Sequence, residues 1–575
     1  MHRANHPSPS IQILSLFFTL LLFFTGCGKN TAAISQASSD NAGKEAQEKM
    51  LTEGNVTLSR QQLSSYGEIT DCSLKEDRKT LTLTLTLPDI PQSDDAFIYL
   101  FALDSYEDSA DFDVYDDTFI TKVQKAASCK FEWDYEKSQL FQYFVPALLL
   151  KGAYVPLSAG SFITNPEVLA DNSNEYPEAH SKKGLLLDPE MLGTPLLTDL
   201  NVQHAIYNIP LSHIMGETTD ENYPTISYEF NGVTYEFNGA AINSYDNLFT
   251  YLTNSGMLST AIVLNDWNEA YPEMIHPLAR NKNSNAYYYA FNTAEEKGCL
   301  YLEAIASFLT ERYSSGEHGL VSCWVVANEI NQHKVWNYMN TGNLELYAAE
   351  FEKALRIFYN AAKSNYADAK VYFSIDHYWN QEEQNNYKYF NGKELIEAIN
   401  TVACEKGNYD WGLAIHPYPD PMTRVNYWSQ TYDKTIDAPL LTLMNLSTTT
   451  DFLKQEEYLD RSGNIRSITV TELGFSSASG EKLQAAAFAY CYFIIDANPY
   501  IEAFIMNRQT DSLEEIKEGL AFGIYEPDHT AKFILDIFKY IDTEQSGDYI
   551  DFMLNILGAD SLEEALSWAQ SEPPA

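Results

Sequence analysis

Two short stretches, far apart in this chain, decide its fold: Trp324-Val325-Val326-Ala327-Asn328-Glu329 and Ile468-Thr469-Val470-Thr471-Glu472-Leu473-Gly474. Each is an apolar run that leads into a glutamate. Short apolar runs of this kind are typical of strands buried on both faces, as in a parallel sheet. In a parallel α/β barrel, the side chains of the active site come from the C-terminal ends of the strands. The two stretches therefore predict a barrel that brings Glu329 and Glu472 to one pocket.

The sequence on either side of these stretches alternates between strand-like and helix-like segments. The expected strands are 184–187, 202–209, 259–264, 321–327, 371–375, 411–415, 466–470 and 501–506. The expected helices lie near 190–200, 243–256, 293–313, 343–363, 392–405, 481–496 and 529–541. This succession predicts the α/β class and a (β/α)8 TIM barrel across residues 183–545, with Glu329 after the fourth strand and Glu472 after the seventh.

Residues 55–182, which precede the barrel, have a different pattern. Leu81-Thr82-Leu83-Thr84-Leu85-Thr86-Leu87 alternates with a period of two, and 96–102 is a second strand candidate. Since no long amphipathic helix intervenes, we expect a smaller β-sandwich-like accessory domain. Inside the barrel region, Asn231-Gly232 predicts a hairpin inserted into a loop. A tail with helical patches is expected at 546–575.

The start of the chain resembles an export signal. Residues 12–25 are almost wholly apolar but too few to span a bilayer comfortably. The run ends in Phe24-Thr25-Gly26-Cys27-Gly28, which resembles a bacterial lipoprotein cleavage box. The resemblance implies a signal peptide at 1–27, a lipid on Cys27, a polar tether at 28–54 and a lipid-anchored protein on the extracellular face of a bacterial cell membrane. An ordinary secretory signal is the alternative.

Composition excludes several classes of protein. The 575 residues are 45% hydrophobic and 20% charged, which describes a globular chain with a sizeable core. A formal net charge of −43 repels phosphate backbones, so we expect no nucleic-acid partner. The seven cysteines form no CxxC pair, and the eleven histidines form no HxH or HExxH motif. We therefore expect neither a metal site nor a cofactor, and a metal-dependent hydrolase is disfavoured.

Two carboxyl groups that meet in one pocket are what the cleavage of glycosidic bonds needs. Asn328-Glu329 on the fourth strand and Thr471-Glu472-Leu473-Gly474 on the seventh resemble the motifs of clan A glycoside hydrolases. The resemblance implies that Glu329 is the acid/base, that Glu472 is the nucleophile and that Asn328 contacts the sugar 2-hydroxyl. His416-Pro417-Tyr418, at the end of the sixth strand, resembles the His-x-Tyr of these enzymes, whose tyrosine hydroxyl lies near the nucleophile.

The chain as a whole resembles an uncharacterised group of bacterial surface proteins with such a barrel, the domain of unknown function 5722. This resemblance covers the barrel and supplies no substrate. It does not cover residues 55–180.

Several other side chains at expected strand ends suit a sugar, because flat rings stack on pyranose faces and polar groups bind hydroxyls. These candidates are Trp267, Trp336, His377 and Trp379. For each of them, packing in the core or in a loop is an equally good interpretation. Two positions depart from the clan A pattern. Asn208 stands where an arginine is usual after the second strand, and the eighth strand leads into Arg508 without the usual tryptophan. Arg508 would bring a cation to the pocket from another direction.

The sequence thus favours a retaining glycoside hydrolase that acts on an oligo- or polysaccharide at the cell surface, by double displacement with two glutamates. The alternative is a non-catalytic glycan-binding lipoprotein on a degenerate barrel. A solute-binding fold of two lobes is disfavoured, because the strand–helix rhythm does not divide into two similar halves. The separation of the Glu329 and Glu472 carboxyl groups discriminates between mechanisms, since ~5–5.5 Å fits retention and ~6.5–9.5 Å fits inversion.

Overall fold

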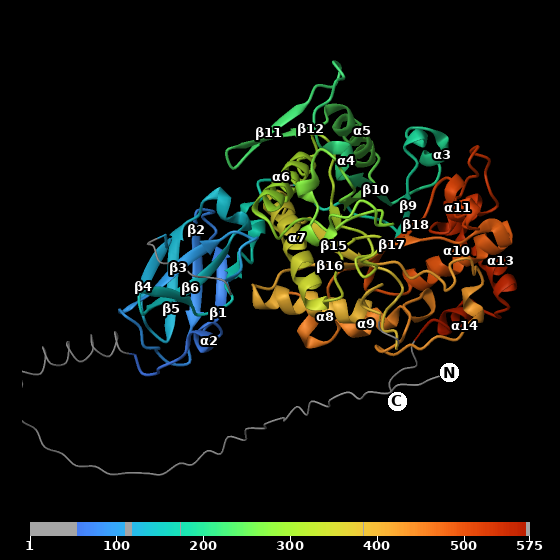
Figure 1. Cartoon of the computed structure of the whole chain (residues 1–575). Coiled ribbons are helices and arrows are strands. Elements are labelled where there is room, and N and C mark those ends of the chain that lie inside the picture. The colour runs from blue at the N-terminus through green and yellow to red at the C-terminus, as the bar shows by residue number, and fades with distance from the viewer. Residues whose placement is uncertain (1–53, 110–117, 173, 383–384, 571–575) are drawn as a thin grey trace, which may run out of the picture. The chain divides into compact units, whose positions relative to one another are not determined.

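The computed structural model describes residues 54–109, 118–172, 174–382 and 385–570, so Cys27 and the predicted signal peptide lie outside the described residues. Eight parallel strands close into a barrel, in which each strand pairs with the next along the chain and the last pairs with the first (Figure 1). They are β9 (Lys183–Leu186), β10 (His204–Pro210), β13 (Leu258–Leu264), β14 (Cys323–Val326), β15 (Lys370–Ile375), β16 (Gly412–Ile415), β17 (Ile468–Leu473) and β18 (Ile501–Met506). The predicted TIM barrel is confirmed.

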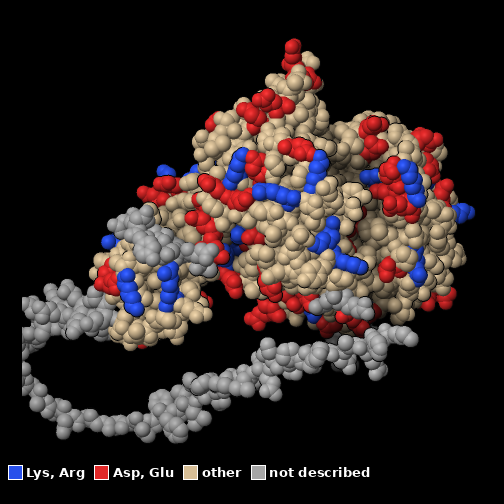
Figure 2. All heavy atoms as spheres, in the orientation of Figure 1, with Lys and Arg blue, Asp and Glu red and all other residues tan. Residues whose placement is uncertain are grey.

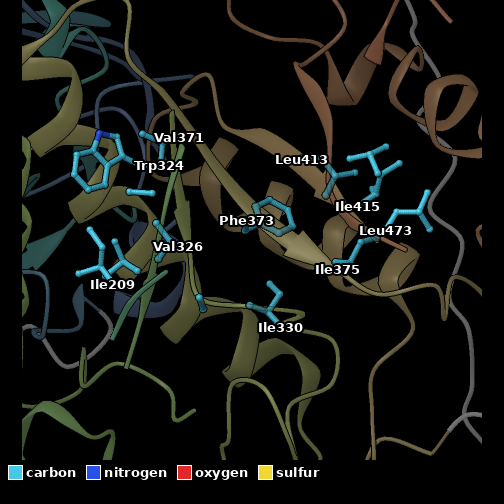
Figure 3. Packing of buried hydrophobic residues seen from close by; sticks show 14 of the residues in the cluster. Ile209, Trp324, Val326, Ile330, Val371, Phe373, Ile375, Leu413, Ile415 and Leu473 are labelled. Atoms are coloured by element: carbon cyan, nitrogen blue, oxygen red, sulfur yellow. The ribbon is translucent and has the colours of Figure 1, made fainter. Parts of the chain in front are cut away.

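Alternate side chains of several barrel strands belong to two different cores. On β14, Cys323 and Val325 join a cluster that fills the barrel interior, together with side chains from β10, β13, β15, β16 and β18. Trp324 and Val326 point the other way and pack in the larger cluster between the strands and the surrounding helices (Figure 3). Since both faces of each strand are buried, the strands read as unbroken apolar runs in the sequence.

The helices around the barrel are α5 (Gly239–Asn254), α6 (Glu296–Arg312), α7 (Leu344–Asn365), α8 (Gly392–Glu405), α9 (Ser447–Leu453), α10 (Glu481–Asp496) and α12 (Ile534–Tyr540). Five of them, α5, α6, α7, α8 and α10, agree closely with expected segments, whereas α9 was not expected from the sequence. Two begin at asparagine caps, whose side chains accept backbone N–H groups that have no partner within the helix: Asn238 for α5 and Asn343 for α7.

Three expected elements have different bounds. The helix near 190–200 is only a short turn, η4 (Pro189–Met191), and a one-turn helix, α3 (Pro195–Thr198), because Gly193 between them has a left-handed φ of 72°. The helix expected from 529 begins five residues later, because a turn that ends with His529 at a φ of 66° precedes it. β17 extends to Leu473, so Glu472 lies within the end of the strand.

The segment before the barrel folds into two antiparallel sheets. One contains β1 (Glu68–Leu74), β2 (Thr80–Thr86) and β5 (Ser128–Asp134), and the other contains β4 (Thr121–Gln124), β3 (Phe97–Leu103), β6 (Tyr143–Leu150), β7 (Ala153–Pro156) and β8 (Ser161–Phe162). Leu81, Leu83 and Leu85 of the first sheet share one core with Ile98 and Phe144 of the second. A separate sheet domain is therefore confirmed, whereas its bounds at 55–182 stay a prediction.

Smaller features complete the described chain. The predicted hairpin is β11 (Ile226–Phe230) and β12 (Val233–Phe237), joined by Asn231 and Gly232, which both have positive φ as a two-residue hairpin turn requires. The tail carries α13 (Gly547–Leu557) and α14 (Leu562–Ser567). Among the residues that the structure describes, no helix combines the length and the apolar character needed to cross a bilayer. Acidic side chains are spread across the face shown in Figure 2, with basic ones among them.

Candidate active site

The turn after β14 carries Glu329 on an unusual backbone. Ala327 and Glu329 both have positive φ, at 64° and 38°, a backbone region that residues other than glycine rarely adopt. Neighbouring strands hold this turn in place. The Ala327 N–H donates to the Val263 carbonyl at 3.0 Å, and the Glu329 N–H donates to Ser374 Oγ at 2.8 Å. Such a conformation persists where the surroundings determine it, as they do here.

A buried carboxylate at the end of β15 also stabilises this turn. Asp376 accepts hydrogen bonds from the side-chain amides of Asn331 and Gln332, and its own N–H donates to Asn331 Oδ1 at 2.9 Å. Because Asn331 and Gln332 follow Glu329 by only two and three residues, Asp376 fixes the segment that carries this glutamate. Asp376 is 4% exposed.

Glu472 is held by two neighbours around the end of β17. Its Oε1 accepts hydrogen bonds from the Tyr418 hydroxyl at 2.9 Å and from Asn507 Nδ2 at 3.2 Å. Asn507 also donates to the Tyr418 oxygen at 3.0 Å. Gly474 is required for this approach, since a Cβ there would lie 2.4 Å from the Asn507 carbonyl oxygen. The glycine of the Thr-Glu-x-Gly motif thus lets the residue after β18 reach Glu472.

His416, at the end of β16, lies close to both glutamates. Its Nδ1 is 2.8 Å from Glu329 Oε1 and 3.9 Å from Glu472 Oε2, and its Nε2 is 3.0 Å from Thr471 Oγ1. The two carboxylate oxygens are therefore separated by no more than the sum of the first two distances. That limit only just reaches the lower end of the ~6.5–9.5 Å range typical of inverting enzymes. The expected meeting of the two glutamates is thus found in the structure.

The environments of the two carboxyl groups differ. The Glu329 side chain is 12% exposed, and the Glu472 side chain is 31% exposed. Burial raises the pKa of Glu329 to about 7; the hydrogen bond from His416 lowers this pKa, and the charges of Asp376 and Glu472 raise it. Burial lowers the pKa of His416, but its hydrogen bond to Glu329 and the charge of Glu472 outweigh that effect, so the pKa is raised. The site therefore holds one carboxyl that keeps a proton near neutrality and one more accessible carboxylate.

Four further candidates are partly or largely buried, and three of them pack against tyrosine rings. Asn328 is 7% exposed and directly precedes Glu329. Trp336 stacks on Tyr287, with ring centroids 4.8 Å apart, and half-buried Trp267 packs edge-on against Tyr289 at 5.5 Å. His377 is half-buried and packs against the neighbouring Tyr378 ring at 4.6 Å.

The expectation that Trp379 contacts a substrate needs correction. Trp379 is fully buried, its indole N–H donates to the Ile436 carbonyl at 2.9 Å, and its ring packs edge-on against Phe452. A side chain enclosed in this way is part of the core. It alternates with His377 along the chain, and the sequence pattern did not show which of the two faces inward.

Asn208 and Arg508 line a common cavity of about 390 Å³ at the C-terminal ends of β9, β10 and β18. Other walls include Asp188, Tyr207 and His213. This placement brings together the two positions that depart from the clan A pattern.

Four residues that bind the glutamates, the turn after β14 or His416 were not among the predicted site residues: Ser374, Asp376, Thr471 and Asn507. Asn507 directly follows the eighth strand, so its position at a strand end was the signal that could have found it. Ser374 lies inside a strand and gives no such signal. No group of three or more His, Cys, Asp or Glu side chains in the described ranges is placed to hold a metal ion.

Comparisons with known proteins place the chain in one sequence family and find only distant structural neighbours. The sequence model of a family of unknown function (DUF5722) matches residues 175–565. No curated protein is significantly similar. A family 39 glycoside hydrolase from the gut symbiont Bacteroides cellulosilyticus WH2 is 13% identical, with a TM-score of 0.40, over 85% of this chain and 83% of that one.

Two further solved structures are similar over a smaller share of this chain. A family 1 β-glucosidase from Thermotoga maritima is 10% identical, with a TM-score of 0.36, over 62% of this chain and 85% of its own. A fungal β-1,4-galactanase is 12% identical, with a TM-score of 0.38, over 62% of this chain and 94% of its own. These structural neighbours are glycoside hydrolases, but likenesses this weak carry no conclusion about this chain. The chemistry has to come from the residues of this chain.

Proposed function

This chain belongs to the family of unknown function DUF5722, and we propose that its barrel is a retaining glycoside hydrolase that acts on an oligo- or polysaccharide. The observation that supports the proposal most is that Glu329 and Glu472 both approach His416 Nδ1, at 2.8 Å and 3.9 Å. Two carboxyl groups this close suit a double displacement, whereas inversion needs room for a water molecule between them.

The two oxygens of Glu472 have different surroundings. Oε1 accepts two hydrogen bonds, from Tyr418 and Asn507, whereas Oε2 lies 3.9 Å from the nearest histidine nitrogen. We assign the attack to Oε2. In the first step a bond forms from Oε2 to the anomeric carbon as the bond to the leaving oxygen breaks, and Glu329 gives its proton to that oxygen.

The second step reverses these roles. Glu329, now a carboxylate, takes a proton from a water molecule, whose oxygen attacks the anomeric carbon and releases Glu472. The raised pKa of Glu329 suits a group that donates and accepts a proton in alternate steps near pH 7. His416 keeps its hydrogen bond to Glu329 and so fixes the direction in which the carboxyl group points.

Replacing the nucleophile tests the proposal. Glu472→Gln removes the attacking carboxylate with little change of volume, so kcat should fall by at least ~10³-fold while the fold is retained. Glu502→Gln is the matched control, because Glu502 lies at the opposite end of the barrel in an ion pair with Lys370 at 2.6 Å. Turnover measured on a panel of glycans, together with circular dichroism, gives the answer. Substantial residual turnover in Glu472→Gln would remove the assignment, and binding without turnover by the unmodified protein would favour the glycan-binding alternative.

We also propose that the protein is anchored to the extracellular face of a bacterial membrane by a lipid on Cys27. The support is the lipoprotein-like sequence around this cysteine. Metabolic labelling with a palmitate analogue should label the protein that retains Cys27. The Cys27→Ser variant should remain unlabelled and should appear in the medium. Equal labelling of both would exclude this anchor.

A further inference from the structure

The cavity lined by Asn208 and Arg508 is linked through the chain to the proposed nucleophile, Glu472. Asn507 donates to Glu472 at 3.2 Å, and the next residue, Arg508, forms part of the cavity wall. The cavity opens where β9, β10 and β18 end, which is the face of the barrel that carries both glutamates. A sugar whose anomeric carbon lies at Glu472 would extend its ring and substituents into this space of about 390 Å³.

Arg508 has unused hydrogen-bond donors in this cavity. Its side chain is 32% exposed, and within the described part of the chain its guanidinium forms no hydrogen bond. Its nearest carboxylate oxygen, Glu515 Oε1, is 3.8 Å away, beyond hydrogen-bond distance. Buried arginines elsewhere are saturated: Arg356 donates to Glu352, Ala403 and Gly407. Arg508 therefore stands out as a cation whose donors point to no protein acceptor.

The acidic side chains around Arg508 are occupied elsewhere. Asp188 accepts from the Thr510 hydroxyl at 2.8 Å and caps the η4 turn through the Glu190 N–H, with His529 Nε2 at 3.8 Å. Asp511 forms a fully buried ion pair with Lys532 at 2.5 Å. These carboxylates hold the loops of the cavity wall, so they do not neutralise Arg508.

Glu515 is the one acidic partner that a ligand could displace. Its Oε2 is buried without a hydrogen-bond partner, and its Oε1 makes only the long contact to Arg508. Burial raises the pKa of Glu515, and the charge of Arg508 lowers it. A carboxylate that forms two short hydrogen bonds with the guanidinium would replace this contact with a stronger one.

We propose that Arg508 binds the carboxylate of an acidic sugar, so that the substrate is a glycan with a uronic acid next to the cleaved bond. The inference rests on the proposed function, because it places the sugar by its anomeric carbon at Glu472. A guanidinium matches a carboxylate with two parallel N–H donors, and among the described residues no other lysine or arginine lines this cavity. Tyr207 and Asn208 offer a ring face and an amide for the hydroxyl groups of the same sugar.

Matched ligands that differ only at the acidic group test this inference. Uronic-acid oligosaccharides and the same oligosaccharides after carboxyl reduction are titrated calorimetrically into the full-length Glu472→Gln variant, which should bind without cleaving. The acidic member of a pair should bind ~10–100-fold more tightly, as expected of a charge-assisted hydrogen-bonded pair. Adding Arg508→Gln should remove this preference, whereas adding Arg508→Lys should keep part of it. Arg78→Gln, in the sheet domain, is the control and should leave the preference unchanged.

The outcomes separate this inference from the proposed function. Equal affinity for acidic and reduced ligands, no affinity for either, or a preference that survives Arg508→Gln would overturn the role of Arg508. If the preference is found but protein with Glu472 intact cleaves none of the acidic ligands, the acidic-sugar site stands and the hydrolase proposal fails. Cleavage of neutral glycans only would support the hydrolase and overturn the acidic substrate.

Discussion

The shared contact at His416 makes Glu329 the residue whose protonation matters most. The His416 Nδ1 contacts Glu329 Oε1 at 2.8 Å inside a buried environment, and Glu472 Oε2 lies 3.9 Å from the same nitrogen. An acid/base must hold a proton in one step and lose it in the next, which needs a pKa near the working pH. Burial provides this for Glu329, whereas the larger exposure of Glu472 leaves its Oε2 accessible.

The pH dependence of kcat/KM should report Glu329. The pKa of Glu329 is raised to about 7, so the group is the required acid below that pH and loses its proton above it. We expect kcat/KM to fall about tenfold per pH unit above pH ~7. In Glu329→Gln this alkaline limb should be absent. An unchanged limb in that variant would assign the ionisation to another group.

Glu329→Gln should also discriminate between leaving groups. In aryl glycosides with acidic phenols, the phenolate leaves without a proton, so the rate of the glycosylation step should fall by less than ~10-fold. In natural glycosides the leaving oxygen needs the proton, so the rate of this step should fall by ~10²–10⁴-fold, the usual contribution of general acid catalysis. Rates measured against the pKa of the leaving phenol check this expectation. An equal loss for all leaving groups would contradict the acid role.

At the scale of elements, the turn after β14 depends on β15. The Glu329 N–H donates to the Ser374 hydroxyl, and Asp376 binds the next two polar side chains along the turn. Because the backbone has positive φ at Ala327 and Glu329, the turn needs these contacts to keep its shape. The element that carries the acid is therefore positioned by its neighbour in the barrel.

Ser374→Ala should loosen Glu329 without touching the substrate. We expect kcat to fall ~10-fold or more with KM nearly unchanged, because a small misplacement of a catalytic group has a large effect on rate. The alkaline limb of the pH profile should shift at the same time. Ser374→Thr keeps a hydroxyl and should recover most of the rate. A change in thermal stability alone, with kcat intact, would mean that Ser374 is merely structural.

The sequence predicted the elements well and the supports of the site poorly. Both-face burial makes each barrel strand an apolar run, and the glutamates stand at strand ends, so the fold and Glu329, Glu472, His416 and Tyr418 could be found by pattern. Ser374, inside β15, and Asn507, just after β18, reach the glutamates from neighbouring strands, and no local pattern encodes such contacts. Trp379 was misassigned for a related reason, because one strand end presents alternate residues to the cleft and to the core.

At the scale of the whole molecule, the barrel depends on a buried ion pair near the end of the chain. Lys183 of β9 donates to Asp542 at 2.6 Å and to the Phe538 carbonyl at 2.9 Å, and both charged side chains are almost fully buried. Ser181 donates to the other oxygen of Asp542 at 2.7 Å. The first strand of the barrel is thereby fastened to the residues around the end of α12.

Lys183→Met should destabilise the fold by about 3–5 kcal/mol, because it leaves Asp542 buried without its cation. Chemical denaturation followed by tryptophan fluorescence measures this change. Lys454→Met is the control: its pair with Asp451 is about 40% exposed on each side, so the free energy of unfolding should change by less than ~1 kcal/mol. The double variant Lys183→Met with Asp542→Leu should recover much of the loss. Equal effects of the two single variants would contradict a special role for the buried pair.

The Lys183–Asp542 pair also sets an order of assembly. Asp542 follows Lys183 by most of the length of the barrel, so a chain that grows from its N-terminus makes β9 long before its counter-charge exists. Until the last helices have been synthesised, the ammonium group of Lys183 on β9 would lack the Asp542 carboxylate with which it pairs in the interior. The barrel is thus expected to close late, after release of nearly the entire polypeptide, and to depend until then on whatever keeps nascent chains from aggregating.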